Sequence, residues 1–207
     1  MMITVRELFG DIDIYLFDQI LKGRFNSDMK ILDAGCGGGR NLVYFLREGY
    51  EVFGVDQNRR AIEQVQSLAL NLAPNLSQNN FQVSSVEKMP FPVEHFDVVI
   101  SSAVLHFAGN EEHFHEMLTE MWRVLKSNGL FFARLASSIG IEDRIQQIQN
   151  RRFLLPDGSE RFLVDEDLLT AAANQLGGIW QEPLKTTNVQ NLRCMSTWVL
   201  RKNLTEN

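Results

Sequence analysis

The segment 31–41, with the sequence ILDAGCGGGRN, places an aspartate and a run of glycines where an apolar strand ends. Glycine loses more conformational entropy on folding than any other residue, so this run implies a sharp turn that another group approaches closely. The following residues, NLVYFL, contain no helix breaker and predict the start of a helix. A strand, a glycine turn and a helix N-terminus form the site at which open α/β sheets bind nucleotide-like ligands.

The spacing of the glycines narrows the class of ligand. Gly35, Gly37 and Gly39 follow the pattern G-x-G-x-G, whereas the dinucleotide fingerprint needs its third glycine one position later, where this chain has Arg40. A P-loop is excluded because no lysine followed by serine or threonine comes after the glycines. Asp33 would repel a pyrophosphate and attract an ammonium group. The alternative is that the glycines serve only tight strand–helix packing.

Asp56 supplies a second polar group at a strand end. It follows the apolar segment GYEVFGV, about 20 residues past the glycines. A carboxylate in that place can accept hydrogen bonds from both hydroxyls of a ribose. Aspartates also end strands for purely structural reasons. The prediction of a ribose-binding carboxylate therefore depends on the number of residues between Asp56 and the glycine loop.

Predicted strands and helices alternate around these residues, which is typical of parallel βαβ units. The expected strands cover 29–33, 50–55, 81–84, 96–101 and 130–135, and the expected helices cover 11–21, 40–49, 59–72, 111–125 and 166–176. Near the end of the chain, predicted strands over 180–189 and 193–200 are separated only by QNL. That connection is too short for a crossover helix and predicts antiparallel pairing.

These elements predict one domain over 1–207 of the α/β class. The expected fold is a Rossmann-like, doubly wound, mostly parallel seven-stranded sheet with an antiparallel C-terminal strand. Residues 1–28 are expected to form an N-terminal helical cap. Residues 151–164 contain Pro156-Asp157-Gly158 between two short apolar runs, and they predict an inserted hairpin that could serve as a lid over a substrate.

Composition limits the partners. The net charge of −6 and the absence of a basic cluster make nucleic acid an improbable partner. No apolar run approaches the roughly 20 residues that span a bilayer, so no membrane association is expected. Cys36 and Cys194 lie far apart and show neither metal-ligand nor redox spacing, which predicts no metal site and a reduced cytoplasmic setting. The oligomeric state stays open.

Four segments, taken in order, resemble one known family: ILDAGCGGGRN, VFGVDQN, SSVEKMPFPVEHFDVVISSAVLHF and RVLKSNGLFFARL. From about residue 29 to 201, the chain resembles a class I S-adenosylmethionine-dependent methyltransferase of the small-molecule type. The resemblance implies S-adenosyl-L-methionine as cofactor and S-adenosyl-L-homocysteine as product. It also implies an in-line displacement in which the enzyme mainly positions the nucleophile, a small molecule whose identity the sequence does not reveal.

The resemblance assigns roles around the cofactor. Asp56 would hold the ribose hydroxyls, Gln57 would flank the adenine, and Asp33 would lie near the ammonium end. Many relatives carry an aspartate where this chain has Ser85, whose hydroxyl can still accept the bond from the adenine amino group, more weakly. The full set of expected cofactor-binding residues is Asp33, Gly35, Cys36, Gly37, Gly39, Asn41, Asp56, Gln57, Ser85, Val86, Ser101 and Ser102. The thiol of Cys36 is expected to pack and not to react.

His106 is the candidate catalytic residue, either as a general base or as a group that orients the substrate. The alternative is a histidine that packs beside Phe107 and does no chemistry. Arg134 interrupts an apolar strand, so it either binds an anionic substrate group or pairs with an acid such as Glu142 or Asp143, which is favoured. Tyr15, on the N-terminal helix, is expected to pack against its neighbours. Arg193 is expected on the surface of its strand. Trp180 and Phe107 are assigned to the core.

Three functions fit the cofactor loop to different degrees. A small-molecule methyltransferase is the leading hypothesis. A non-catalytic protein that senses S-adenosylmethionine or S-adenosylhomocysteine is the alternative, because it would need the same loop. An NAD-dependent oxidoreductase is disfavoured by the glycine spacing and by Asp33.

Overall fold

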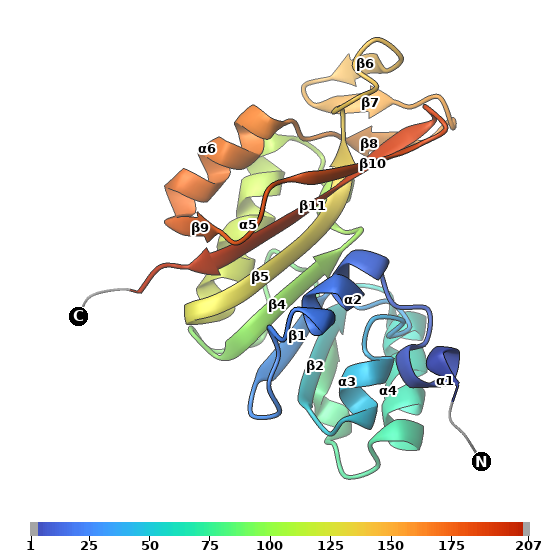
Figure 1. Ribbon diagram of the computed structural model, residues 1–207, viewed down its shortest axis with the longest axis vertical. Helices are drawn as coiled ribbons and strands as arrows, with labels where there is room; N and C mark the ends of the chain where they lie inside the picture. Colours follow the sequence, from blue (N-terminus) through green and yellow to red (C-terminus); the bar gives the residue numbers. More distant parts are fainter. Residues whose placement is uncertain (1–3, 205–207) are drawn as a thin grey trace.

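A twisted sheet with helices on both faces forms the centre of the molecule (Figure 1), in a computed structural model that describes residues 4–204. Five parallel strands build one half: β1 (Lys30–Ala34), β2 (Glu51–Asp56), β3 (Phe81–Val83), β4 (Phe96–Ser102) and β5 (Leu125–Ser137). Three more complete it: β9 (Gly178–Trp180), β10 (Lys185–Val189) and β11 (Arg193–Lys202). The spatial order is β10-β11-β5-β4-β1-β2-β3, with β9 also paired to β11.

The predicted fold class is confirmed. Among the described strands of this sheet, β11 alone runs in the opposite direction, and it pairs antiparallel with β5, β9 and β10. The single strand expected over 180–189 is divided into β9 and β10, so eight strands occupy seven positions. Pro183 lies in the break, and proline has no N–H to donate to a strand ladder.

Six helices accompany the sheet in the described part of the chain: α1 (Val5–Phe9), α2 (Ile14–Leu21), α3 (Val43–Arg47), α4 (Arg59–Leu72), α5 (Glu111–Val124) and α6 (Glu166–Leu176). The predicted bounds of α4 and α6 are confirmed, and both helices begin at a side-chain cap, Asn58 and Asp165 respectively. The helix predicted over 40–49 is shorter, because Gly37 and Gly39 hold the preceding backbone in the left-handed region (φ +52° and +84°).

The central strands β1, β4 and β5 contain long apolar runs because both faces of the sheet are covered there. Ile31 and Phe132 pack with α2, α3 and α4 on one face, whereas Leu32, Val99 and Phe131 pack with α5 and α6 on the other. Successive residues of one strand thus enter opposite cores. This is why the sequence shows continuous apolar runs without alternation.

The insert forms a small antiparallel sheet of its own, β6 (Gln146–Gln149), β7 (Arg152–Leu154) and β8 (Glu160–Phe162), beyond the end of β5 in Figure 1. The expected hairpin is β7–β8. Strand β6 was not predicted, because its sequence QQIQ is polar and all of its residues are exposed. The Ser138 N–H donates to the carbonyl of Val164 at 2.9 Å, which ties the insert to the end of β5.

Replacing Phe132 by alanine tests the account of the core. Phe132 is completely buried, so Phe132→Ala should lower the free energy of unfolding by about 3–5 kcal/mol. Phe107→Ala removes the same atoms from a side chain that is 58% exposed, and should cost less than about 1 kcal/mol. Urea denaturation followed by circular dichroism measures both, and equal losses would contradict the assigned packing.

Candidate active site

The glycine loop after β1 needs its glycines for three different reasons. Gly35 has φ +88°, and a Cβ there would lie 2.3 Å from the Val104 side chain, so only glycine fits. Gly37 also has a positive φ, but a Cβ there would meet no atom within 4 Å, so its side is open. Gly39 packs against α4, where a Cβ would lie 2.7 Å from Val65. The close approach of Val104 therefore requires glycine at position 35, Gly37 leaves its side of the loop open, and Gly39 lets the loop pack against α4.

The Asp56 carboxylate fastens this loop to the end of β2. One oxygen accepts a hydrogen bond from the Gly37 N–H at 3.0 Å, and the other accepts from the Asn58 N–H at 2.8 Å. A carboxylate has about four acceptor positions, so each oxygen can accept one more donor. The side chain is half-buried and lines a cavity, which presents this remaining capacity to a ligand with two hydroxyl groups.

Asp33 lies beneath the loop at the end of β1. Its side chain is 1% exposed, and neither carboxylate oxygen has a hydrogen-bond partner among the described residues. Burial raises the pKa of Asp33 to about 7; the nearby Arg40 guanidinium opposes this rise and the Asp56 carboxylate adds to it. A positively charged group of a ligand in the loop would therefore be attracted to this position.

Two cavities meet at Gly35, along the carboxyl edge of the parallel strands. The first, here the loop cavity, has a volume of about 490 Å³ and is lined by Gly10, Asp11, the glycine loop and Ser102. The second, here called the strand-end cavity, has a volume of about 480 Å³, and Asp56, Gln57 and residues 84–87 are among the residues that line it. Most of the predicted cofactor residues therefore lie on two adjoining walls, at the place where open α/β sheets bind ligands.

The burial and hydrogen bonds of the other predicted cofactor residues differ from one residue to the next. Val86 is buried and lines the strand-end cavity together with the exposed Ser85. Cys36 is 4% exposed, and burial raises the pKa of its thiol, consistent with packing. Ser101 is fully buried, and no described residue bonds to its hydroxyl. Asn41 lines the loop cavity, and its side chain accepts from the Asp13 N–H at 3.0 Å.

Comparison with known proteins places the chain in a family. Residues 32–133, from β1 to β5, match the methyltransferase domain family. An uncharacterized methyltransferase of Synechocystis is 30% identical over 102 residues, which are 49% of this chain and 44% of that protein. A crystal structure of a SAM-dependent methyltransferase from Methanosarcina mazei superimposes with a TM-score of 0.72 at 20% identity, covering 90% of this chain and 98% of that one. Residues 32–133 belong to the methyltransferase domain family, and the chain as a whole has the fold of the SAM-dependent methyltransferases.

A second solved structure shares the methyltransferase fold. It is the 1,6-didemethyltoxoflavin-N1-methyltransferase of Burkholderia thailandensis, with a TM-score of 0.68 at 18% identity, covering 89% of this chain and 75% of that one. The present chain spans about half the length of the curated relatives that it matches. Over residues 4–204, no cluster of His, Cys, Asp and Glu side chains could hold a metal ion, and no helix is both long and apolar enough to cross a membrane.

The His106 side chain is a hydrogen-bond donor at neutral pH. The side chain is 7% exposed, and its Nδ1 accepts from the Ala136 N–H at 3.3 Å, which leaves the ring proton on Nε2. Burial, followed by the nearby Arg161, lowers the pKa of His106 to about 4. Of the two predicted catalytic roles, this geometry favours orientation of a substrate over proton abstraction, because the nitrogen without a proton is already occupied.

Arg134 pairs with an acid, as favoured from the sequence, but the acids named, Glu142 and Asp143, are wrong. Its Nε lies 2.9 Å from the carboxylate of Asp13, the N-cap of α2, and its guanidinium lies 4.7 Å from the centre of the Tyr15 ring. The Glu142 carboxylate instead accepts from a backbone N–H in its own turn. Sequence gave no signal for Asp13, because the contact depends on the N-terminal segment crossing to β5.

The assignment of Phe107 to the core is also wrong. Phe107 is 58% exposed and lines the strand-end cavity. It follows β4 in a short 3-10 turn, Leu105–Phe107, in which Leu105 and His106 take the buried positions instead. Arg193, expected on a strand surface, is exposed on β11.

Glu87 is a site residue that sequence reasoning missed. It lines the strand-end cavity two positions after Ser85, and its carboxylate is hydrogen-bonded to the His113 ring. Burial alone would raise the pKa of Glu87, but the bonds from His113 and Ser85 outweigh it and hold the pKa below its usual range. The signal was the acid in SSVEK, which lies close to the expected adenine-binding position.

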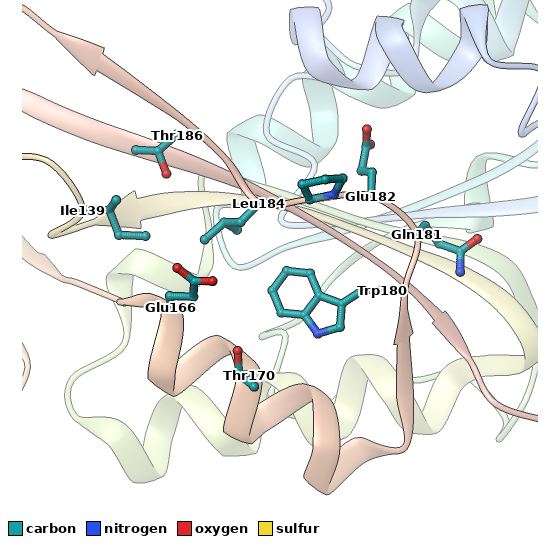
Figure 2. Close-up of a pocket in the computed structure, with 9 residues that line it drawn as sticks. Ile139, Glu166, Thr170, Trp180, Gln181, Glu182, Leu184 and Thr186 are labelled. Carbon is teal, nitrogen blue, oxygen red and sulfur yellow. The ribbon is translucent and has the colours of Figure 1, made fainter.

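Trp180 packs at the edge of the core as expected, 6.1 Å from Trp198 between ring centres. Figure 2 shows that it also lines a separate cavity of about 740 Å³, in which Glu166 and Thr170 project from α6 toward Trp180 and Leu184 at the break between β9 and β10. This cavity shares no lining residue with the loop cavity or the strand-end cavity. It therefore lies apart from the candidate active site.

Replacing Asp33 by asparagine tests the buried carboxylate. Its pKa is raised in the folded state, so between pH 4 and pH 7 the unfolded chain has lost a proton that the folded chain retains, and stability falls as pH rises. Between pH 5 and pH 8, the free energy of unfolding of the natural protein should fall by roughly 2–3 kcal/mol relative to Asp33→Asn. Urea titrations at both pH values measure this difference.

The exposed Asp28 provides the control, since Asp28→Asn should follow the natural protein across the whole pH range. If the Asp33→Asn variant and the natural protein lose stability in parallel, Asp33 has an ordinary pKa and the electrostatic account of the loop fails.

Proposed function

We propose that this protein transfers the methyl group of S-adenosylmethionine to a small-molecule acceptor. The observation that carries the proposal is the Asp56 carboxylate. It is held by the Gly37 and Asn58 backbone, lines the strand-end cavity and retains acceptor capacity on both oxygens, which suits a ribose diol. The family match over residues 32–133 supports the same function.

The remaining features of the site fit the parts of this cofactor. The unpartnered carboxylate of Asp33 and the unpartnered hydroxyl of Ser101 lie one position before the ends of β1 and β4, and we assign them to the methionyl end of the cofactor. Gln57, Ser85 and Val86 line the other end, which would receive the adenine. When bound, S-adenosylmethionine supplies a methyl group on a positively charged sulfur, which is already activated for displacement.

The chain's own contribution is then to bind and orient. Two rigid walls made of strand ends and a glycine turn hold a ligand in one place, and proximity with correct alignment lowers the barrier of a displacement reaction. The Nε2–H of His106 can donate to an acceptor molecule and fix its orientation. A general base is needed only where the nucleophile still carries its proton.

No feature of the site favours the binding-only alternative. An NAD-dependent oxidoreductase is disfavoured, because Arg40 stands where the third glycine of the dinucleotide fingerprint is needed. The buried Asp33 beneath the loop would also repel the pyrophosphate of NAD.

Isothermal titration calorimetry tests the cofactor. S-adenosylmethionine and S-adenosylhomocysteine should bind saturably, and NAD should not. Asp56→Ala should weaken binding of both sulfur nucleosides by about 1–3 kcal/mol, or roughly 5- to 150-fold, because a charged acceptor of two hydroxyl donors is lost. Asp28→Ala, in an exposed turn, is the control and should bind normally. Unchanged affinity in Asp56→Ala would show that the ribose lies elsewhere.

Transfer itself is tested with cell extracts that have been separated into small-molecule fractions. Incubation with S-adenosylmethionine labelled in its methyl group should move the label into one or more fractions. The Asp56→Ala protein should move markedly less at a subsaturating cofactor concentration. Tight binding of S-adenosylmethionine without transfer to any fraction would support the sensor hypothesis in place of the enzyme.

A further inference from the structure

A third cavity adjoins the strand-end cavity at Ala103 and is rich in arginine. This arginine cavity has a volume of about 460 Å³, and its polar lining consists of Arg134, Arg161, Arg193, His106, Asp157 and Ser159. Three arginines face one aspartate here, in a chain whose net charge is −6. The local excess of positive charge is therefore a property of this cavity and not of the protein as a whole.

Five separate elements contribute these charged and polar groups, and His106 comes from the 3-10 turn after β4. Arg134 belongs to β5, Arg193 to β11 and Arg161 to β8 of the insert. Asp157 and Ser159 come from the turn between β7 and β8, so the insert forms one wall of the cavity. The charges are brought together by the tertiary fold and are not a run of basic residues along one strand.

The three arginines differ in how far their charge is already compensated. Arg134 forms an ion pair at 2.9 Å with the buried carboxylate of Asp13. Arg193 lies 3.8 Å from Asp157, whose carboxylate also accepts from Ser159. Arg161 donates to a neighbouring backbone carbonyl at 2.7 Å, and no described carboxylate lies within ion-pair distance of it.

The uncompensated charge lies at the junction with the proposed cofactor site. The Arg161 guanidinium is 5.1 Å from the centre of the Phe107 ring, and Phe107 lines the strand-end cavity. His106 precedes Phe107 and adds a neutral N–H donor to the arginine cavity. An acceptor molecule bound here would reach toward the cofactor across the Ala103 boundary.

We infer that the acceptor is a small molecule with an anionic group, a carboxylate or a phosphate, that binds Arg161 with Arg193 in the arginine cavity. This inference rests on the proposed methyltransferase function and names the class of its substrate. The planar, forked guanidinium matches carboxylate and phosphate oxygens, and charge-assisted hydrogen bonds of this kind are the strong ones. A cationic acceptor would be repelled by Arg161.

Binding of simple anions tests this inference on the full chain saturated with S-adenosylhomocysteine. Benzoate and phenyl phosphate should bind saturably in nuclear magnetic resonance titrations, whereas benzamide, which has the shape of benzoate without its charge, should bind at least about tenfold more weakly. Stronger binding of benzoate assigns a carboxylate, and stronger binding of phenyl phosphate assigns a phosphate. Equal binding of all three compounds would overturn the inference.

Two variants locate the binding group. Arg161→Gln should weaken binding of the preferred anion about tenfold, because a charged donor is lost. Arg193→Gln should also weaken it, and this exposed position gives a second test if Arg161→Gln fails to fold. The control is Arg152→Gln, on the same insert but outside the cavity lining, which should leave anion binding unchanged. Equal effects of the cavity and control variants would overturn the inference.

The methyl-transfer assay supplies an independent outcome. Label from S-adenosylmethionine should appear in extract fractions retained by an anion exchanger, and transfer only to unretained fractions would contradict an anionic acceptor. Failure to bind S-adenosylhomocysteine would contradict the proposed function itself. Normal binding of S-adenosylhomocysteine, with no preference for benzoate or phenyl phosphate over benzamide, would contradict only the inference about the acceptor.

Discussion

The structure is organised around a carboxylate buried without a partner. Asp33 is the penultimate residue of β1, in the middle of the sheet, and its two oxygens accept no hydrogen bond from the described residues. Burying an isolated charge is costly, which is why the pKa of Asp33 rises to about 7. The glycine loop above it is fixed by the Asp56 carboxylate on the neighbouring strand. A cation held in that loop would relieve this cost, so the unpartnered carboxylate would favour a cationic ligand.

The N-terminal segment and the C-terminal strands contact each other beside the glycine loop. Residues Gly10 and Asp11 form part of the loop cavity, and the helix that follows them is anchored to the C-terminal strands. The Asp13 carboxylate pairs with Arg134, and the Tyr15 hydroxyl lies 2.6 Å from that of Thr187 on β10. The antiparallel end of the sheet therefore supports the wall of the proposed cofactor site, in addition to lining the arginine cavity. Helix α2 thus connects the antiparallel end of the sheet to the wall of the loop cavity.

The sequence predicted those features that depend on residues close together in the chain. The glycine spacing, the strand-end position of Asp56, and the bounds of α4 and α6 all depend on residues a few positions apart. Contacts between distant segments were not predictable: the partner of Arg134 lies in the N-terminal segment, and the wall of the arginine cavity comes from the insert. Strand β6 was missed because a polar strand has no apolar period. The break at Pro183 was missed because it lies at the edge of the sheet, where a strand ladder tolerates an interruption.

The charge state of Asp33 on cofactor binding tests the account most directly. Titration of S-adenosylmethionine at pH 6.5, in buffers with different enthalpies of ionisation, measures the number of protons exchanged with the solvent. Because the free carboxyl has a pKa of about 7 and a bound cation lowers it, binding should release a substantial fraction of a proton, and Asp33→Asn should abolish that release. Binding enthalpies that do not depend on the buffer, or a release that persists in Asp33→Asn, would contradict the account.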